Sequence, residues 1–281
     1  MRTRHKLLGL AGFVIGMCVL GGAVTVRAAQ MDGGSNHVTT GHITRIVVIG
    51  DSTVCNWPVT RTTKRGWGEV LPEFFNSQRV KVINRALSGR SSKSFIDEGH
   101  WKAIRQMKPA PDYVLIQFGH NDNPGKGPKR ETKPGPMPAQ LPGSGIGSKP
   151  KDWFRHNIET YIKQSRAMGA VPIVVTPMSR CHFDSHGKVK DWNKPYAQGA
   201  CAAATALGAP CIDLNTYSAN MYEKLGPKES LALQYHAPDG KVDRTHYNAM
   251  GASIWAKWIT QQLEAKQPEL KQVVDMHKLD H

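Results

Sequence analysis

Apolar residues gather along the chain in five short runs that are separated by longer, mixed stretches. The runs are rich in Val and Ile, and most of them end beside a glycine or a polar residue. Runs of this length and composition are typical of strands that are buried on both faces of a sheet. We therefore predict strands at Ile43–Ile49, Val80–Ile83, Tyr113–Phe118, Val171–Thr176 and Cys211–Leu214.

The stretches between these runs contain apolar residues spaced four positions apart, which is a helical pattern. Residues 152–168 have this pattern, and Gly169 follows them as a typical helix stop. The same spacing recurs near the C-terminus and predicts a last helix. The two sets are Phe154, Ile158 and Ile162 in the first helix, and Met250, Ile254 and Trp258 in the last.

Strands that alternate with helices favour parallel pairing, because each connection then crosses a face of the sheet. We predict an α/β fold, a three-layer α/β/α sandwich around one parallel sheet of about five strands. One domain spans residues 43–266, after a linker at 29–42, and residues 267–281 are expected to form a polar tail. In such sheets ligands bind beyond the carboxyl ends of the strands. The unusual polar residues of this chain occur at those ends.

The first 28 residues resemble a secretory signal peptide. Arg2, Arg4 and Lys6 give a cationic start, and residues 7–26 form an apolar run that ends near small residues suited to cleavage. We expect an exported protein, periplasmic or extracellular, that has no membrane span after cleavage. The alternative is an uncleaved anchor helix, because the apolar run approaches spanning length.

Charge narrows the choice of partner. The chain has 37 Lys and Arg against 22 Asp and Glu, a formal net charge of +15. Residues 1–28 hold four of these cations and no acid, so the remainder carries +11. A basic surface favours polyanionic partners. The sequence has no helix-turn-helix, zinc-finger or RNP motif, so we expect the partner to be an acidic polysaccharide and not nucleic acid. We also expect a monomer.

Two further features leave alternatives open. The four cysteines that follow residue 28 are Cys55, Cys181, Cys201 and Cys211, and an oxidising compartment permits three ways of pairing all four.

The segment 123–151 is rich in Pro and Gly and holds six Lys or Arg against one Glu. It forms either a flexible surface insertion or a mobile basic flap beside the site.

Ser52 is the first candidate for chemistry, because it lies in the turn Gly-Asp-Ser-Thr directly after the first predicted strand. A serine hydroxyl is a weak nucleophile and needs a base, a group that orients the base, and donors for the oxyanion. Asp243 and His246 are three residues apart just before the last predicted helix. This spacing lets the carboxylate reach a ring nitrogen on the same turn and leaves the other nitrogen for the serine.

The oxyanion donors are expected at the ends of the next two strands. Gly89 offers a backbone N–H without a side chain in the way, and Asn121 offers its amide. Together with the N–H of Ser52 they make three donors for a developing alkoxide.

These residues carry a resemblance to the SGNH, or GDSL-type, hydrolases. The four ordered sequence blocks of that family are matched by GDST (50–53), the glycine of SGRS (88–91), GHND (119–122) and DRTH (243–246). The family fold is an α/β/α sandwich, SGNH/flavodoxin-like, which agrees with the predicted order of elements. The resemblance implies a serine esterase that works through an acyl-enzyme and needs no cofactor.

A narrower resemblance concerns the substrate. The segments GDSTVCNWP, NRALSGRSSKSF and VVTPMSR are similar to those of rhamnogalacturonan acetylesterases, which remove acetyl groups from acidic pectin backbones. This implies a carbohydrate esterase for acetylated rhamnogalacturonan. Trp57 follows the Ser52 turn and is the best candidate for stacking on a sugar ring, and Arg90 is a candidate for holding a uronate carboxylate. The 123–151 segment and Arg244 within the D-x-x-H motif depart from the family pattern and leave the polysaccharide open.

Other functions remain as alternatives. The enzyme could act on acetylated xylan, another glycan or a lipid ester, or the chain could be a noncatalytic protein that binds acidic polysaccharide. His182 and His186, on either side of Asp184, have a helical metal-ligand spacing, but the polar residues and Gly187 around them favour a loop. We therefore predict no metal site.

Overall fold

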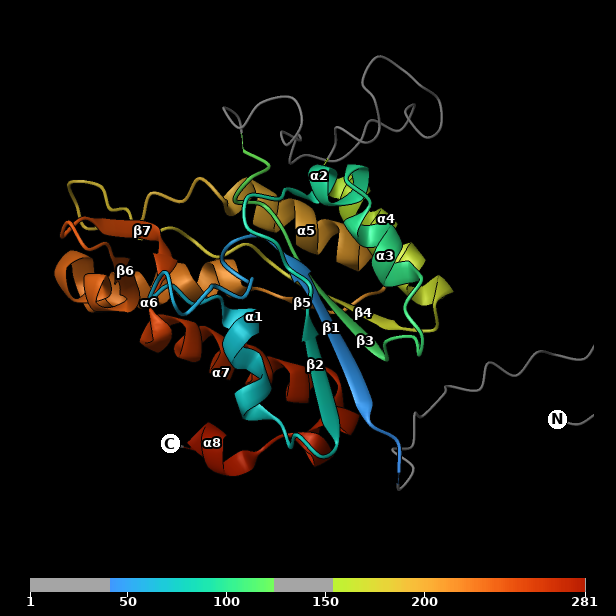
Figure 1. Ribbon diagram of the computed structural model, residues 1–281. Coiled ribbons are helices and arrows are strands. Elements are labelled where there is room, and N and C mark those ends of the chain that lie inside the picture. Colours follow the sequence, from blue (N-terminus) through green and yellow to red (C-terminus); the bar gives the residue numbers. More distant parts are fainter. Residues whose placement is uncertain (1–40, 124–153, 281) are drawn as a thin grey trace, which may run out of the picture. The chain divides into compact units, whose positions relative to one another are not determined.

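The computed structural model describes residues 41–123 and 154–280, and one parallel sheet lies at its centre (Figure 1). The strand order is β2-β1-β3-β4-β5, and every neighbouring pair is parallel. The prediction of a five-stranded parallel sheet is confirmed. The strands are β1 (Thr44–Gly50), β2 (Val80–Asn84), β3 (Tyr113–Gln117), β4 (Val171–Val175) and β5 (Cys211–Ile212).

Strand β1 lies between β2 and β3, and its side chains alternate between the two faces of the sheet. Val47 pairs with Ile83 on one side and with Val114 on the other. Ile46 and Val48 belong to one hydrophobic cluster, while Val47 and Ile49 belong to the other. A strand buried on both faces needs a continuous apolar run, and the sequence of β1 supplies it.

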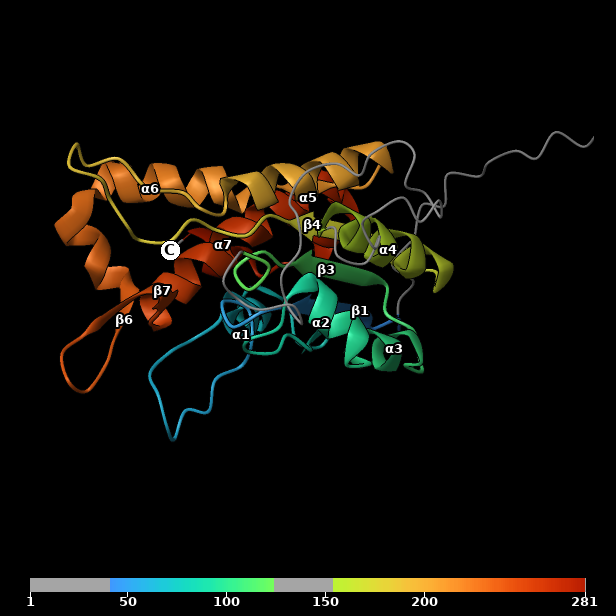
Figure 2. The same cartoon turned by 90° about the horizontal axis from the view of Figure 1, so that it is seen from above.

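Helices cover both faces of the sheet, as Figures 1 and 2 show. They bury their apolar faces in the two clusters on either side of the strands. The predicted three-layer sandwich is therefore confirmed. One face holds α1 (Trp67–Val70), η1 (Leu71–Phe74), α6 (Leu214–Glu229) and α7 (Ala249–Lys266); the other holds α2 (Ser92–Asp97), α3 (His100–Arg105), α4 (Phe154–Ala167) and α5 (Lys194–Ala206).

The last long helix, α7, was expected to carry Met250, Ile254 and Trp258 along one face, but a different face is the buried one. Met250 is 60% exposed, and the other two are only partly buried. The buried face holds small residues that allow close approach, together with one large aromatic side chain. Its members are Gly251, Ala252, Trp255, Ala256, Ile259, Thr260 and Leu263.

The expectation of a polar tail at residues 267–281 is wrong for the part that the structure describes. A 3-10 helix, η4 (Pro268–Val273), and the short helix α8 (Met276–Asp280) follow α7. Leu270 and Val273 are buried in the core beside α7 and η1. The charged residues of this segment interrupt its apolar positions, so the sequence pattern did not predict that one side of it is buried.

A second, two-stranded sheet was not predicted. Strands β6 (Gln234–His236) and β7 (Val242–Tyr247) pair in antiparallel fashion after the turn η3 (Ser230–Leu233). The pairing shifts register between Gln234 and Tyr235. This hairpin carries two of the predicted site residues.

The cysteines divide into one bond and two buried thiols. Cys201 and Cys211 form a disulfide that joins α5 to β5, which selects one pair among those left open by the sequence. Cys55 and Cys181 are free and buried. Burial raises the pKa of Cys55 to about 12 and that of Cys181 to about 11, so both thiols stay protonated at neutral pH.

Within residues 41–123 and 154–280, no helix has both the length and the apolar character that a membrane span requires. The expected signal peptide and linker (1–42, except its last two residues) and nearly all of the 123–151 insertion lie outside the described residues.

Candidate active site

Ser52 lies in a tight turn at the carboxyl end of β1. The backbone N–H groups of Val54 and Cys55 both donate to the carbonyl of Asp51, and the Asp51 carboxylate accepts the N–H and the hydroxyl of Thr53 at 2.9 and 2.7 Å. A Cβ at Gly50 would lie only 2.6 Å from the carbonyl oxygen of Gln117. The glycine therefore lets the strand pass close to β3 before the turn.

The structure brings Ser52, His246 and Asp243 together. His246 Nε2 lies 2.7 Å from Ser52 Oγ, and His246 Nδ1 lies 2.7 Å from Asp243 Oδ2. The carboxylate can only accept, so Nδ1 carries a proton and Nε2 of the neutral ring accepts the serine hydroxyl. Ser52 and His246 are 194 residues apart in sequence. The arrangement is that of a nucleophile, a base and the group that orients the base.

Asp243 and His246 lie just before α7, and the segment that carries them is strand β7. The second carboxylate oxygen of Asp243 accepts the backbone N–H groups of Thr245 and His246 at 3.0 and 3.1 Å, which bends the chain locally. Partial burial opposes ionisation of Asp243, but its hydrogen bond with His246, the positive charge of that ring when it is protonated, and the hydrogen bond from Lys64 hold its pKa well below the ordinary value. The carboxylate is therefore charged over the whole physiological range.

The loop after the nucleophile turn holds the hairpin against β1. The Arg65 N–H donates to the carbonyl of Tyr247 at 3.0 Å, and the buried Tyr247 hydroxyl donates to the carbonyl of Thr53. Both bonds connect β7 directly to the segment that carries Ser52.

Trp57 was predicted to bind substrate, and the structure places it against His246 and the turn that carries Ser52. Its indole N–H donates to the Ser52 carbonyl at 3.0 Å, and its ring meets the His246 ring edge-on, with centroids 5.5 Å apart. The side chain is partly buried. It supports the nucleophile turn, whether or not it also contacts a sugar.

Gly89 and Asn121 occupy the loops after β2 and β3, as predicted. Gly89 has φ +78°, a left-handed conformation that favours glycine. The Asn121 side-chain amide donates to the carbonyl of Arg90 at 3.1 Å, which leaves its second N–H for another acceptor. The next residues tie the loops further, since the Ser92 hydroxyl donates to the Asp122 carboxylate at 2.6 Å.

Arg90 was also predicted to bind substrate. Its guanidinium lies 2.9 Å from Glu98 and donates to the Ser88 carbonyl at 3.0 Å. Arg90 is thus paired with Glu98 on the exposed surface, and a substrate carboxylate would have to compete with Glu98 for the guanidinium group.

Lys64 is a charged neighbour that sequence reasoning missed. Its ammonium nitrogen lies 2.9 Å from Asp243 Oδ2, although the two residues are 179 positions apart. Lys64 belongs to an irregular loop between β1 and α1 and to none of the motifs, so nothing in its sequence context indicates this contact.

The predicted loop around Asp184 is confirmed. Its carboxylate accepts the N–H groups of His186 and Lys188 at 2.8 and 2.9 Å, in a turn. Among the described residues, no group of three or more His, Cys, Asp or Glu side chains has an arrangement that could hold a metal ion.

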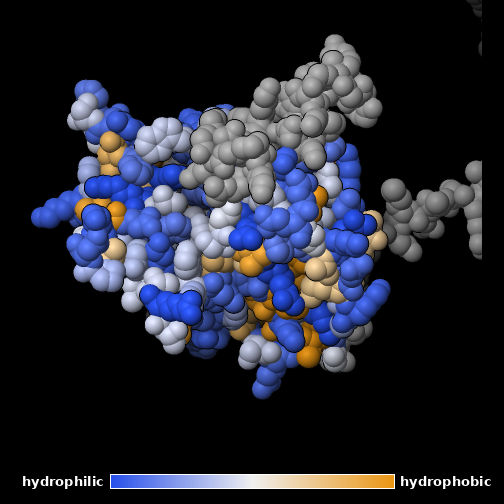
Figure 3. All heavy atoms as spheres, turned by 45° about the horizontal axis from the view of Figure 1, so that its top comes forward, coloured by the Kyte–Doolittle hydropathy of each residue, from blue (hydrophilic) through white to orange (hydrophobic). Residues whose placement is uncertain are grey.

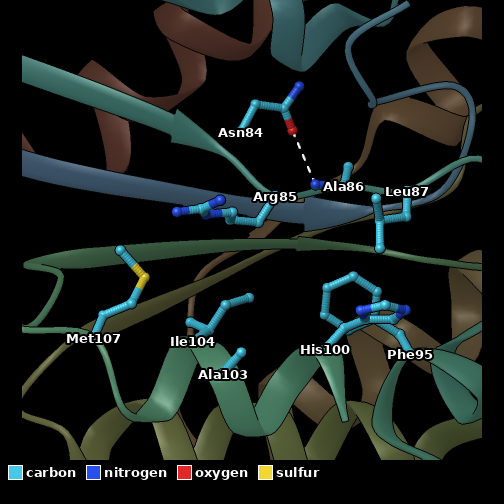
Figure 4. A pocket seen from close by; sticks show the side chains of 9 residues that line it. All are labelled: Asn84, Arg85, Ala86, Leu87, Phe95, His100, Ala103, Ile104 and Met107. Carbon is cyan, nitrogen blue, oxygen red and sulfur yellow. Dashed lines mark hydrogen bonds between the residues drawn. The ribbon is translucent and has the colours of Figure 1, made fainter. Parts of the chain in front are cut away.

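A hollow of about 460 Å³ lies beside the edge strand β2 (Figure 4). Leu87, shortly after β2, faces Phe95 and the α3 residue His100 across it, and Asn84 turns away to accept the N–H of Ala86 at 3.1 Å. None of the predicted site residues lines this hollow. We therefore assign the chemistry to the Ser52 cluster and not to this cavity.

Comparison with known proteins identifies the family of the chain. The GDSL-like Lipase/Acylhydrolase family matches residues 48–254, which include Ser52, Asp243 and His246. The chain is 33% identical over 228 residues to the rhamnogalacturonan acetylesterase RhgT of Bacillus subtilis (strain 168), covering 78% of this chain and 89% of that protein. It is 29% identical over 214 residues to the probable rhamnogalacturonan acetylesterase YesY of the same organism, covering 76% and 89%.

Two solved structures share the fold. Protein YxiM of Bacillus subtilis superposes with a TM-score of 0.62 at 29% identity, covering 80% of this chain and 57% of that one. The acetylxylan esterase Axe2 of Geobacillus stearothermophilus superposes with a TM-score of 0.54 at 15% identity, covering 79% and 95%. At that identity the second likeness concerns the fold alone.

Proposed function

Because the chain belongs to the GDSL-like lipase/acylhydrolase family, and is an esterase, we propose that it removes O-acetyl groups from pectic rhamnogalacturonan. The observation that carries the mechanism is the pair of 2.7 Å contacts that runs from Ser52 through the His246 ring to Asp243. We infer from it a two-step acyl transfer.

In the first step Ser52 Oγ attacks the acetyl carbonyl while His246 Nε2 takes its proton. Asp243 holds the ring in the required tautomer and stabilises the imidazolium that forms. The carbonyl oxygen becomes an oxyanion, for which the Ser52 N–H, the Gly89 N–H and the Asn121 amide are the proposed donors. His246 then protonates the sugar oxygen as the C–O bond breaks, and the acetyl group remains on Ser52.

In the second step water replaces the sugar as the attacking group. His246 takes a proton from the water, which adds to the acetyl carbonyl of the acyl-enzyme. The same donors stabilise the second oxyanion. His246 returns a proton to Ser52 Oγ as that bond breaks, and acetate leaves.

The substrate assignment is supported by likeness and by charge. RhgT and YesY, similar to this chain over about three quarters of its length, are named for rhamnogalacturonan. The net charge of +11 that remains after residue 28 suits a polyanionic polymer. Figure 3, in which the top of Figure 1 comes forward, shows mainly hydrophilic side chains, which suits a polar polymer better than a lipid.

Acetate release from different esters tests this proposal. Wild-type protein and Ser52→Ala are incubated with acetylated rhamnogalacturonan, acetylated xylan and short-chain lipid esters. We expect release from the pectic polymer that the variant lacks. Release from xylan or lipid alone would discard the pectic substrate and keep the mechanism. Binding of acidic polysaccharide without release from any ester would favour the noncatalytic alternative.

We also propose that the protein is exported. The sequence of residues 1–28 and the Cys201–Cys211 disulfide support this, since disulfides persist in oxidising compartments. Fractionation of producing cells should find the protein outside the cytoplasm, with a new N-terminus near residue 29. An uncleaved chain in the cytoplasm would contradict the proposal.

A further inference from the structure

Lys64 shares the carboxylate of Asp243 with the base. Its Nζ lies 2.9 Å from Asp243 Oδ2, and the same oxygen accepts the His246 ring at 2.7 Å. Oδ1 accepts two backbone N–H groups. Both oxygens of the carboxylate are thus engaged by described residues, and one of the partners is a full positive charge.

Two aromatic rings hold the ammonium group in place. Lys64 Nζ lies 5.2 Å from the centre of the Trp57 ring and 4.7 Å from the centre of the Tyr235 ring, distances at which a cation is attracted to a ring face. The side chain is only 19% exposed. The Lys64 backbone is fixed as well, because its N–H donates to the Thr62 hydroxyl at 3.1 Å. A lysine held in this way is a fixed charge and not an arm that reaches for substrate.

We propose that Lys64 is a positioning residue whose charge, shared with His246 on one carboxylate oxygen, sets the lower end of the pH range in which His246 acts as base. The inference rests on the proposed function, since it assigns that role to His246. A neighbouring carboxylate stabilises imidazolium, and a cation on the same carboxylate offsets part of that effect. Lys64 therefore keeps the ring neutral, and able to accept a proton, in more acidic solution.

Other charged groups around the pair are placed differently. Asp51 precedes the nucleophile and interacts electrostatically with His246, while Arg180, after β4, interacts with Asp243. Neither forms an ion pair with His246 or Asp243 among the described side chains. Arg65, next to Lys64, lies 3.5 Å from Glu69. Lys64 is the cation in hydrogen-bonding contact with the carboxylate.

The test compares pH profiles of kcat/KM for 4-nitrophenyl acetate. Lys64→Met removes the charge and keeps the apolar stem, and Lys64→Arg keeps the charge. Lys241→Met is the matched control, because Lys241 pairs with Asp239 at 2.7 Å in the exposed loop of the same hairpin. We expect the acidic limb of Lys64→Met to move up by about one pH unit. Below that limb the loss relative to wild type is then about tenfold, with the Arg variant and the control close to wild type.

Two outcomes would overturn the inference. A Lys64→Met profile that superimposes on that of wild type means that the charge has no effect on the base. An equal loss at every pH, also seen in Lys64→Arg, means that the residue serves only packing. Thermal unfolding of each variant shows whether it folds.

A second measurement needs no turnover and separates this inference from the proposed function. The His246 ring is titrated by ¹⁵N NMR in the Ser52→Ala background, with and without Lys64→Met. An upward shift of the His246 midpoint on loss of the charge supports the role of Lys64 even if no ester is hydrolysed. An unchanged midpoint contradicts it even if the protein is an active esterase.

Discussion

The site joins two regions that are built in different ways. Ser52 follows β1, a strand paired on both sides and buried on both faces, so its position is fixed by the whole sheet. Asp243 and His246 lie on β7, one strand of a two-stranded hairpin with a shifted register. The position of the nucleophile therefore depends on the core, whereas that of the base depends on how a small hairpin docks against the core.

A few contacts make that docking. They are the bonds from Arg65 to Tyr247 and from Tyr247 to Thr53, and the contact of Lys64 with Asp243. At the start of α7, Gly251 lies so close to η3 that an added Cβ would be 2.3 Å from the Leu233 carbonyl oxygen.

The largest effects are expected from removing the chemistry on either side of the junction. Ser52→Ala should lower kcat by about 10⁶-fold, and Asp243→Asn, which leaves the base in place with the wrong tautomer, by about 10⁴-fold. Steady-state kinetics on an acetyl ester measure both, with unfolding curves as the control. Equal losses from Asp243→Asn and Ser52→Ala would contradict the view that the hairpin carboxylate only orients the base.

Gly251→Ala should break the docking itself. The added methyl group would lie 2.3 Å from the Leu233 carbonyl oxygen and 2.7 Å from Tyr247 Cβ. Because the first of these is a backbone atom, the clash cannot be relieved by rotating a side chain. We expect a loss of about 1–3 kcal/mol in the free energy of unfolding and a fall in kcat. Gly208→Ala is the matched control, since Gly208 has φ +58° but open space around it. That variant should lose about 1 kcal/mol and keep kcat.

Tyr247→Phe removes one bond across the junction without changing the shape of the core. The Thr53 carbonyl keeps the bond that the Trp67 N–H donates at 3.1 Å, so the loss is that of one hydrogen bond, about 0.5–1.5 kcal/mol. Because Thr53 follows Ser52 directly, we also expect kcat to fall. Urea unfolding and kinetics on the same samples check both expectations, and an unchanged stability would show that the bond contributes nothing to docking.

The smallest effect is expected from a change at Arg90, an exposed residue in the loop after β2. Arg90 and Glu98 form a pair with side chains about 40% exposed, so Arg90→Gln should change stability by less than about 1 kcal/mol. If the Arg90 charge also holds substrate, KM for the acidic polymer should rise while KM for 4-nitrophenyl acetate stays constant. An equal change in both would contradict a role in binding the polymer.

The same contrast explains what the sequence could predict. The five strands and the turn at Ser52 follow from β-branched runs and from a motif that is local in sequence. Strands β6 and β7 were not predicted because most of their residues are polar, such as Gln234 and Arg244, and so form no apolar run. Their contacts with the rest of the domain, which are distant in sequence, hold them in place. Lys64 was not predicted because its contact with Asp243 depends on the path of an irregular loop.

The C-terminal segment and α7 failed for a related reason. Leu270 stands between Glu269 and Lys271, and the buried face of α7 includes Gly251, Ala252 and Ala256, small residues that weigh little in a hydrophobic pattern. Periodicity identifies that a helix exists more securely than it identifies which face is buried.

The central claim is that the hairpin base activates the serine at the end of the sheet. It is tested most directly by reaction with a phosphonate esterase inhibitor, followed by mass spectrometry of the labelled peptide. The account predicts label on Ser52, with the rate greatly lowered in His246→Ala and lowered less in Asp243→Asn. Label on another residue, or an unchanged rate in His246→Ala, would contradict it.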